Sequence, residues 1–144
     1  MITVRKMVFA DVDAVSQLEE QTFSMPWSRN AFWEMVDRTD AVYLVAEENN
    51  VILGVCGVLN MAGDGEITNV AVNESVRRKG IAKLMLTKLL DEGTKLGITA
   101  FTLEVRKSNL PATGLYEKLG FENVGIRPNF YDKPNEDAVI MWKR

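Results

Sequence analysis

Hydrophobic residues recur along this chain at two spacings, every second position in some segments and every third or fourth position in others. The first spacing is typical of strands and the second of amphipathic helices. The strand-like segments are residues 3–8, 42–47, 51–61, 66–72, 99–105, 122–127 and 137–142. Helices are predicted after Asp11, after Ser28, at 81–96, and from Ser108 or Asn109 to Gly120. The order β-α-α-β-β-β-α-β-α-β-β predicts a mixed α/β (α+β) fold, with helices on the faces of one sheet.

The ends of the helices carry their own signals. Asp11 and Ser28 are good N-cap residues, because a short polar side chain can accept a hydrogen bond from a first-turn amide. Gly97 and Gly120 each follow a helical pattern, and glycine readily adopts the left-handed conformation that ends a helix. The chain of 144 residues shows no repeat, low-complexity tract or linker, so we expect a single domain over residues 1–144.

Composition narrows the function classes. The chain is 47% hydrophobic and 26% charged, with a formal net charge of −3. That balance argues against nucleic-acid or anionic-membrane binding driven by net charge. The longest apolar run, 51–59, is too short to span a bilayer, and the first residues do not form a signal segment. We therefore expect a cytoplasmic protein, and the lack of an obvious exposed apolar stripe favours a monomer.

Two residue counts exclude whole chemistries. The chain has no histidine, which rules out Ser-His-Asp and Cys-His catalysis. Its single cysteine, Cys56, cannot form a disulfide within the chain or build a Cys/His zinc site, so no metal is expected. Because Cys56 lies in a glycine-flanked apolar segment without an activating base, a buried inert thiol is expected there.

A basic turn precedes the longest predicted helix. Its sequence is Arg77-Arg78-Lys79-Gly80-Ile81-Ala82-Lys83, directly between a strand and a helix. Cations at a helix N-terminus oppose the macrodipole, whereas the free amides there attract an anion. A solvated basic loop is the usual meaning of such a run, but the strand-turn-glycine-helix context favours a phosphate site. Neither a Walker motif nor a G-x-G-x-x-G motif is present.

This turn resembles the pyrophosphate-binding motif Q/R-x-x-G-x-G/A of the Gcn5-related N-acetyltransferases (GNAT). The likeness continues through Leu103-Glu104-Val105-Arg106, Asn109 and Leu115-Tyr116-Glu117-Lys118-Leu119-Gly120-Phe121. It also includes Pro26-Trp27-Ser28 and Glu136-Asp137-Ala138-Val139-Ile140-Met141, so it covers almost the whole chain. Taken together, these segments resemble the RimI-type ribosomal-protein alanine N-acetyltransferases.

The resemblance implies a mostly antiparallel GNAT sheet, acetyl-CoA as donor and a protein N-terminal amine as acceptor. The implied partner is therefore a ribosomal protein rather than a nucleic acid or a membrane. For the donor, it implies backbone contacts from Val70, Ala71 and Val72, pyrophosphate contacts from Arg77, Arg78, Lys79, Gly80, Ile81, Ala82 and Lys83, and an amide contact from Asn109. One departure is Pro128, which stiffens its segment and could change the shape of the acceptor groove.

Acetyl transfer to an amine needs a neutral amine, a stabilised oxyanion and a proton for the leaving thiolate. Glu104 is the candidate general base, at the end of a strand; from position alone, an ion pair with Arg106 would be preferred. Tyr116 is the candidate general acid, against the alternative of a core tyrosine. For both residues the resemblance favours the catalytic role. A backbone amide of 70–72 would hold the oxyanion.

Weaker assignments remain open. Asn109 is equally well explained as a helix cap and as a donor ligand. Trp27 could line the acceptor groove or only pack at a helix start, and Tyr131 could line the peptide entrance or be an exposed loop residue. Alternative functions are acetylation of a small amine or a lysine, or non-catalytic binding of an acyl-CoA. The presence of both Glu104 and Tyr116 argues against the non-catalytic alternative.

Overall fold

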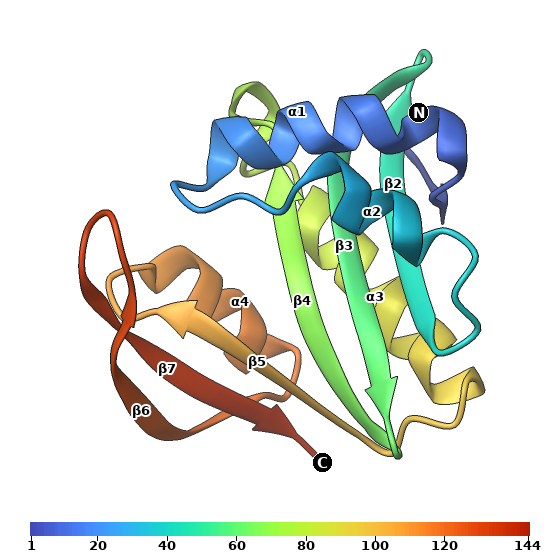
Figure 1. Cartoon of the computed structure of the whole chain (residues 1–144). Helices are drawn as coiled ribbons and strands as arrows, with labels where there is room; N and C mark the ends of the chain where they lie inside the picture. The colour runs from blue at the N-terminus through green and yellow to red at the C-terminus, as the bar shows by residue number, and fades with distance from the viewer.

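Seven strands form one sheet in the computed structural model, which describes residues 1–144 (Figure 1). The strands are β1 (Thr3–Lys6), β2 (Ala41–Glu48), β3 (Val51–Met61), β4 (Asp64–Val72), β5 (Ala100–Arg106), β6 (Glu122–Tyr131) and β7 (Glu136–Lys143). Across the sheet their order is β1-β2-β3-β4-β5-β7-β6. Every neighbouring pair is antiparallel except β4 and β5, which are parallel. The predicted mixed sheet is confirmed.

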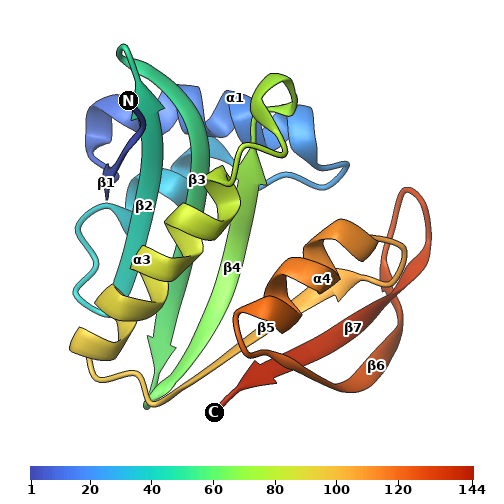
Figure 2. The ribbon, with the colours of Figure 1, turned by 180° about the vertical axis from the view of Figure 1, so that it is seen from behind.

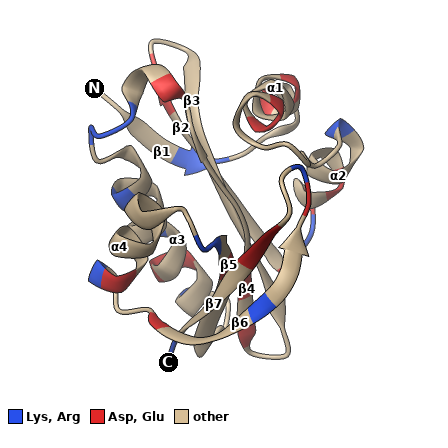
Figure 3. Ribbon diagram, turned by 90° about the vertical axis from the view of Figure 1, so that its left-hand side faces the viewer, with Lys and Arg blue, Asp and Glu red and all other residues tan.

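Four α-helices cover the two faces of the sheet. They are α1 (Val12–Thr22), α2 (Arg29–Met35), α3 (Ile81–Lys95) and α4 (Leu110–Lys118), and two short 3-10 turns, η1 (Phe9–Asp11) and η2 (Glu74–Val76), accompany them. Helices α1 and α2 lie on the face seen in Figure 1, and α3 and α4 lie on the face seen in Figure 2. Figure 3 looks along the sheet, with the two pairs on opposite sides. None of the helices has the length and apolar composition needed to span a membrane.

Alternation along the strands gives each face its own core. Val42, Leu44 and Ala46 of β2 contribute to the larger cluster, which also contains buried residues of α3 and α4. The intervening Tyr43 and Val45 belong to the smaller cluster with α1 and α2. Because successive strand side chains point to opposite faces, one strand fills both cores. Cys56 is fully buried in the larger cluster, as predicted, and burial raises the pKa of its thiol.

The sheet opens between β4 and β5. Their parallel register contains only three pairs, Asp64 with Ala100, Gly65 with Phe101, and Glu66 with Thr102. Beyond these pairs the two strands separate toward their carboxyl ends (Figure 1), and the rest of β4 has only β3 as a strand partner. A register shift in the β3–β4 ladder leaves Thr68 as the extra residue on β4. The carboxyl half of β4 therefore has one edge without a strand partner.

Most of the predicted helix ends are confirmed. Ser28 caps α2 by accepting from the Ala31 amide at 3.1 Å. Gly97 and Gly120, each with a φ of 97°, follow α3 and α4. Asp11 is the N-cap residue of α1, as predicted, but its side chain does not make the expected cap bond to the helix.

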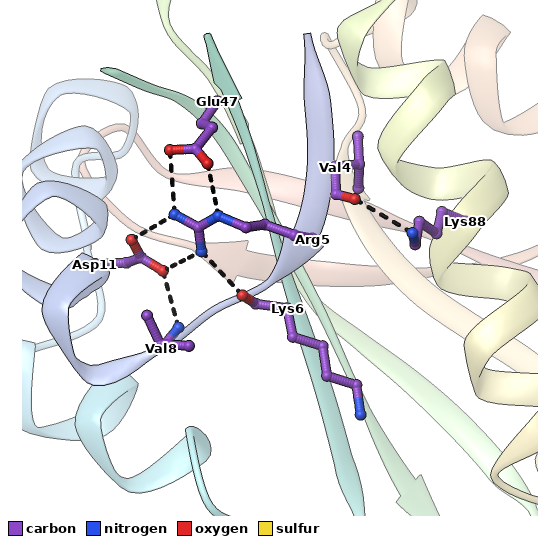
Figure 4. A network of polar contacts seen from close by, with 7 residues as sticks. All are labelled: Val4, Arg5, Lys6, Val8, Asp11, Glu47 and Lys88. Atoms are coloured by element: carbon purple, nitrogen blue, oxygen red, sulfur yellow. Dashed lines mark hydrogen bonds and ion pairs between the residues drawn. The ribbon is translucent and has the colours of Figure 1, made fainter. Parts of the chain in front are cut away.

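The Asp11 carboxylate instead belongs to an ion-pair network around Arg5 (Figure 4). Arg5 donates to both Asp11 oxygens, at 2.8 and 2.9 Å, and to both Glu47 oxygens, at 2.8 and 3.2 Å. Asp11 also accepts from the Val8 amide at 2.8 Å. The Arg5 guanidinium holds the pKa of Asp11 below its usual value. This network joins β1, β2 and the start of the first helical segment.

The last two strands extend beyond their predicted limits. The segment predicted for β6 ends at Arg127, yet the strand continues through Pro128 to Tyr131 with an irregular register. Within the irregular stretch, Asn129 has a φ of 54°, and its amide donates to the Asp137 carboxylate at 2.9 Å. Because β6 is the edge strand of the sheet, a residue without an amide hydrogen is tolerated there.

Candidate active site

The open edge of β4 presents main-chain groups that no neighbouring strand uses. The Asn73 amide donates to Leu53 of β3 at 2.8 Å. In an antiparallel ladder these bonds alternate, so Ala71 also faces β3, whereas the amides and carbonyls of Val70 and Val72 face the opening. Val70 and Val72, two of the three residues expected to contact acetyl-CoA, thus have main-chain groups directed toward the opening.

The turn after β4 collects further unpaired amides. Arg78 and Gly80 both have left-handed backbone angles, with φ of 69° and 77°. Gly80 is the N-cap of α3 and has no side chain with which to cap the first-turn amides. Alternating left-handed residues next to a helix start form a concave group of N–H donors that suits an anion. The expected phosphate site therefore has the backbone geometry that it requires.

The charges around this turn are not neutralised within the protein. Four cations, Arg77, Arg78, Lys79 and Lys83, make no ion pair, and the first turn of α3 contains no acidic residue. The only polar contact of their side-chain nitrogens is from Arg77 Nε to the Val72 carbonyl at 3.4 Å. Unpaired cations and free amides at one helix start fit a pyrophosphate group.

Asn109 is the N-cap of α4. Its side-chain oxygen accepts from the Ala112 amide at 3.3 Å, which confirms the capping role. Its exposed side-chain NH2 group makes no hydrogen bond within the protein and remains available as a donor.

Glu104 lies on the α1–α2 side of β5. Its neighbours Leu103 and Val105 are buried in the core under α3 and α4, so alternation directs Glu104 to the other face. The expected alternative pairing with Arg106 is wrong: Glu104 Oε1 lies 3.5 Å from Nε of Arg127, on β6. Arg106 pairs with Glu136 instead.

Tyr116 lies on the other face of the sheet. It is buried in the core beneath α4, with its ring centroid 5.9 Å from that of Phe121. Its hydroxyl has no hydrogen-bond partner, yet no fully buried polar side-chain atom lacks one, so the oxygen must reach accessible space. Burial raises the pKa of Tyr116 and keeps the phenol protonated near neutrality.

Tyr131 is close to both candidate catalytic residues. Burial, followed by the charge of Glu104, raises the pKa of Tyr131 to about 12. An ionised Tyr131 would in turn raise the pKa of Tyr116. Tyr131, at the end of β6, is thus near enough to Glu104 of β5 and to Tyr116 of α4 for charge to act between them. Glu104 and Tyr116 themselves belong to opposite faces of the sheet.

Trp27 packs in the smaller core, with its ring centroid 5.4 Å from that of Phe32 and 6.0 Å from that of Tyr43. Its amide donates to the buried carboxylate of Glu19 at 3.0 Å. That carboxylate also accepts from Asn69 at 3.1 Å, and Asn69 accepts from the Tyr43 hydroxyl at 3.2 Å. Burial raises the pKa of Glu19.

This buried Glu19 network was not predicted from the sequence. The available signal was that Glu19 follows Val12 and Val15 at helical spacing, which places it on the apolar side of α1. The network ties the connection between α1 and α2 to the bulged part of β4.

The sequence model of a protein family, described as the acetyltransferase (GNAT) family, matches residues 12–121. The chain belongs to the GNAT family. A relative from Bacillus subtilis (strain 168) is 36% identical over 140 residues, which cover 96% of this chain and 93% of that protein. A Salmonella typhimurium relative named [ribosomal protein bS18]-alanine N-acetyltransferase is 32% identical over 144 residues, covering 98% of this chain and 96% of that relative.

A solved structure extends the likeness to three dimensions. The crystal structure of the ribosomal-protein-S18-alanine N-acetyltransferase from Escherichia coli superimposes with a TM-score of 0.90 at 30% identity, covering 99% of this chain and 93% of that chain. This GNAT protein is thus an acetyl-CoA-dependent N-acetyltransferase, as the motifs predicted.

Proposed function

We propose that this acetyltransferase modifies the N-terminal α-amine of a small-subunit ribosomal protein that begins with alanine. Relatives that match nearly the whole chain carry names with that activity toward protein bS18. The proposed chemistry uses Glu104 as base and Tyr116 as acid, two residues that lie on opposite faces of the sheet.

The donor would lie along the open edge of β4. The Val70 and Val72 main chain would bind its extended arm, and the amides and cations from Arg77 to Lys83 would hold its pyrophosphate. Ala71 would contribute from within the ladder, and the free NH2 group of Asn109 would add a hydrogen bond. Acetyl-CoA supplies an acetyl group activated as a thioester. A main-chain amide at Val70 or Val72 would stabilise the oxyanion of the transfer.

Glu104 would accept the proton of the acceptor amine, directly or through one water. An α-amine has a pKa of about 8, whereas a lysine amine has a pKa of about 10.4. A carboxylate is too weak a base to prepare a lysine efficiently, but it suffices for an α-amine that is partly neutral at pH 7. The exposed partner Arg127 lies at the rim, so Glu104 can exchange this contact for the acceptor.

Tyr116 would donate its proton to the leaving sulfur. Its phenol is protonated at neutral pH, and its hydroxyl has no competing acceptor within the protein. Because burial raises the pKa of this phenol further above that of a thiol, the transfer is uphill and would take place as negative charge develops on the sulfur. Trp27 and Tyr131 would line the path by which the acceptor reaches Glu104.

The observation that carries the proposal is a GNAT sheet that opens between β4 and β5, in a chain whose relatives over nearly its full length are named for this activity. The test is release of free thiol from acetyl-CoA with two peptides of matched length. One peptide begins with a free alanine and contains no lysine. The other has a blocked N-terminus and one internal lysine.

Turnover with the alanine peptide alone supports the proposal. A synthetic N-terminal segment of the small-subunit protein should then be a better acceptor than an unrelated alanine peptide. Turnover with the lysine peptide alone contradicts the proposed acceptor. Activity toward neither peptide, together with CoA binding in a calorimeter, would direct attention to small amines or to a non-catalytic acyl-CoA-binding role.

A further inference from the structure

Arg106, the last residue of β5, joins three segments that are distant in the sequence. Its side chain is only 25% exposed, although it lies at the surface of the sheet. The guanidinium donates to Pro134 O at 3.0 Å, Glu136 Oε1 at 3.2 Å, Asp132 O at 2.9 Å and Ser24 Oγ at 3.3 Å. It also stacks over the Tyr131 ring, 4.5 Å from its centroid. We call this set of contacts around one side chain the hub.

The two segments that meet at this hub are the β6–β7 turn, residues 132–135, and the α1–α2 connection, residues 23–28. They lie side by side in Figure 1, near the wide end of the opening between β4 and β5. The Ser24 hydroxyl also donates to the Asp132 carbonyl, at 3.4 Å. The α1–α2 connection contains Trp27, and Tyr131 directly precedes the turn, so Arg106 links both residues proposed to line the acceptor path.

The chemistry of the hub suits a fixed position. Glu136 accepts from Arg106 with one carboxylate oxygen and from the Ser108 amide with the other, at 2.6 Å. These donors lower the pKa of Glu136, so it stays ionised at neutral pH. Two of the other partners are main-chain carbonyls, which fixes the path of the turn itself. Only a planar guanidinium offers several donors in the fixed directions that these acceptors need.

Arg106 has no direct contact with the proposed base. Glu104 pairs with Arg127, and the donors of Arg106 are directed at the turn and at Ser24. Its influence on the reaction must therefore pass through the position of the two segments.

We propose that Arg106 is a positioning residue for the acceptor. It holds the β6–β7 turn and the α1–α2 connection in one arrangement, so the acceptor chain meets a path that is already formed. Losing this preorganisation weakens acceptor binding and leaves donor binding intact. The inference deepens the proposed function and rests on it, because it assigns the role to the acceptor side of the same site.

The test compares Arg106→Gln, Arg106→Lys and Ser24→Ala with the wild-type enzyme. Arg38→Gln is a matched control, since Arg38 also donates to a carboxylate, that of Asp40, but lies outside the site. We expect Arg106→Gln to raise the KM for the alanine peptide by about tenfold or more, because an ordered path becomes mobile. The KM for acetyl-CoA should change by less than about twofold and kcat by less than about threefold, given that neither donor nor base touches Arg106.

The other two variants grade the effect. Arg106→Lys should be nearly as impaired as Arg106→Gln, because an ammonium cannot reproduce the fork of donors. Ser24→Ala removes only the contact to the α1–α2 connection, so its peptide KM should rise by about two- to fourfold. Arg38→Gln should match the wild type.

Hydrogen exchange gives a readout that needs no acceptor. In Arg106→Gln, amides of residues 23–28 and 132–135 should exchange faster, with unchanged protection in α3. The proposal is overturned if exchange in both segments is unchanged. It is also overturned if peptide and acetyl-CoA KM values rise together, or if kcat alone falls. A wild-type enzyme that ignores the alanine peptide refutes the proposed function instead, and the exchange result then still decides whether Arg106 fixes the two segments.

Discussion

The two sides of the opening are built in different ways. The proposed donor side consists of one continuous stretch, the end of β4, the basic turn and the start of α3, and it offers backbone groups and unpaired charges. The proposed acceptor side is assembled from α1, the α1–α2 connection, β5, β6 and the β6–β7 turn, which hydrogen bonds hold together across up to 108 positions of sequence. A local site depends on backbone angles and charge, whereas an assembled site depends on particular long-range contacts.

This difference predicts how substitutions on each side affect the enzyme. Substitutions on the donor side should have graded, salt-dependent effects, because several amides and cations share the work. Substitutions on the acceptor side should have abrupt effects, because single side chains connect whole segments. The following changes test that contrast, from the largest expected effect to the smallest.

The largest effect is expected where the two sides meet. Glu104→Gln and Tyr116→Phe should each lower kcat by about 10²- to 10⁴-fold, the usual range for a lost general acid or base. Both variants preserve shape, so the dissociation constant of CoA, measured by calorimetry, should stay within about twofold of the wild type. Weaker CoA binding with unchanged kcat would remove both residues from the chemistry.

Neutralising the donor turn comes next. The triple variant Arg77→Gln, Arg78→Gln, Lys79→Gln should raise the KM for acetyl-CoA by about tenfold, from several exposed charge contacts of a few tenths to 1 kcal/mol each. The difference from the wild type should shrink as salt rises, because screening weakens exposed charge pairs. The KM for the alanine peptide should stay unchanged.

A variant with the same change in net charge serves as the control. Lys6→Gln, Arg38→Gln, Lys95→Gln removes three cations that lie away from the turn. If that variant raises the donor KM equally, long-range charge rather than the turn explains the effect.

Asn109 can be divided into its two roles. Asn109→Ala should lower the free energy of unfolding by about 1 kcal/mol, the usual cost of losing an N-cap. Asn109→Asp keeps a capping oxygen and loses the NH2 group, so it should retain stability and still raise the donor KM by about two- to fivefold, the effect of losing one hydrogen bond. Chemical denaturation and donor titration of both variants would separate the roles; a wild-type donor KM in Asn109→Asp would leave only the cap.

The smallest effect concerns the buried Glu19 on the acceptor side. Burial raises the pKa of Glu19 in the folded protein, so the folded state holds this proton more tightly than the unfolded state. At acidic pH Glu19 is protonated and does not oppose folding. As the pH rises above the ordinary glutamate pKa, about 4.3, Glu19 lowers the free energy of unfolding. Glu19→Gln cannot titrate and should lack this dependence.

The measurement is the free energy of unfolding of wild type minus that of Glu19→Gln, from pH 4 to pH 7. We expect the difference to decrease with pH, by less than the about 1.4 kcal/mol per pH unit that one whole proton would give. The lowered pKa values of Asp11 and Glu47 act in the opposite direction in both proteins, so they cancel in the difference. A difference that is flat or rises with pH would contradict the assignment to Glu19.

The same contrast explains what the sequence could predict. The strand and helix order, the Ser28 cap and the buried Cys56 follow from local spacing and are confirmed. The basic turn is equally local, which is why its left-handed glycine and unpaired cations fit the motif. The roles of Glu104, Tyr116 and the donor-binding residues are predictions that the kinetic tests above address.

The acceptor side was not predictable in the same way. Glu104 and Arg106 share a strand face, so the sequence favoured an ion pair between them, yet each has a partner on another strand. The side chain of Asp11 was expected to cap α1, yet it pairs with Arg5, whose guanidinium is shared with the distant Glu47 of β2. Partner choice among several charges depends on the assembled sheet, and local pattern carries no information about it.

The three-pair seam between β4 and β5 also has a mechanical consequence. Few hydrogen bonds join the two parts of the sheet along this seam, and the core beneath α3 and α4 continues across it. A molecule bound between the two parts of the sheet contacts both of them, so its binding free energy adds to the free energy of unfolding. At a ligand concentration one hundred times Kd, this contribution would be about 2.7 kcal/mol. In a cell, the lifetime of this enzyme would then follow the supply of CoA and its thioester.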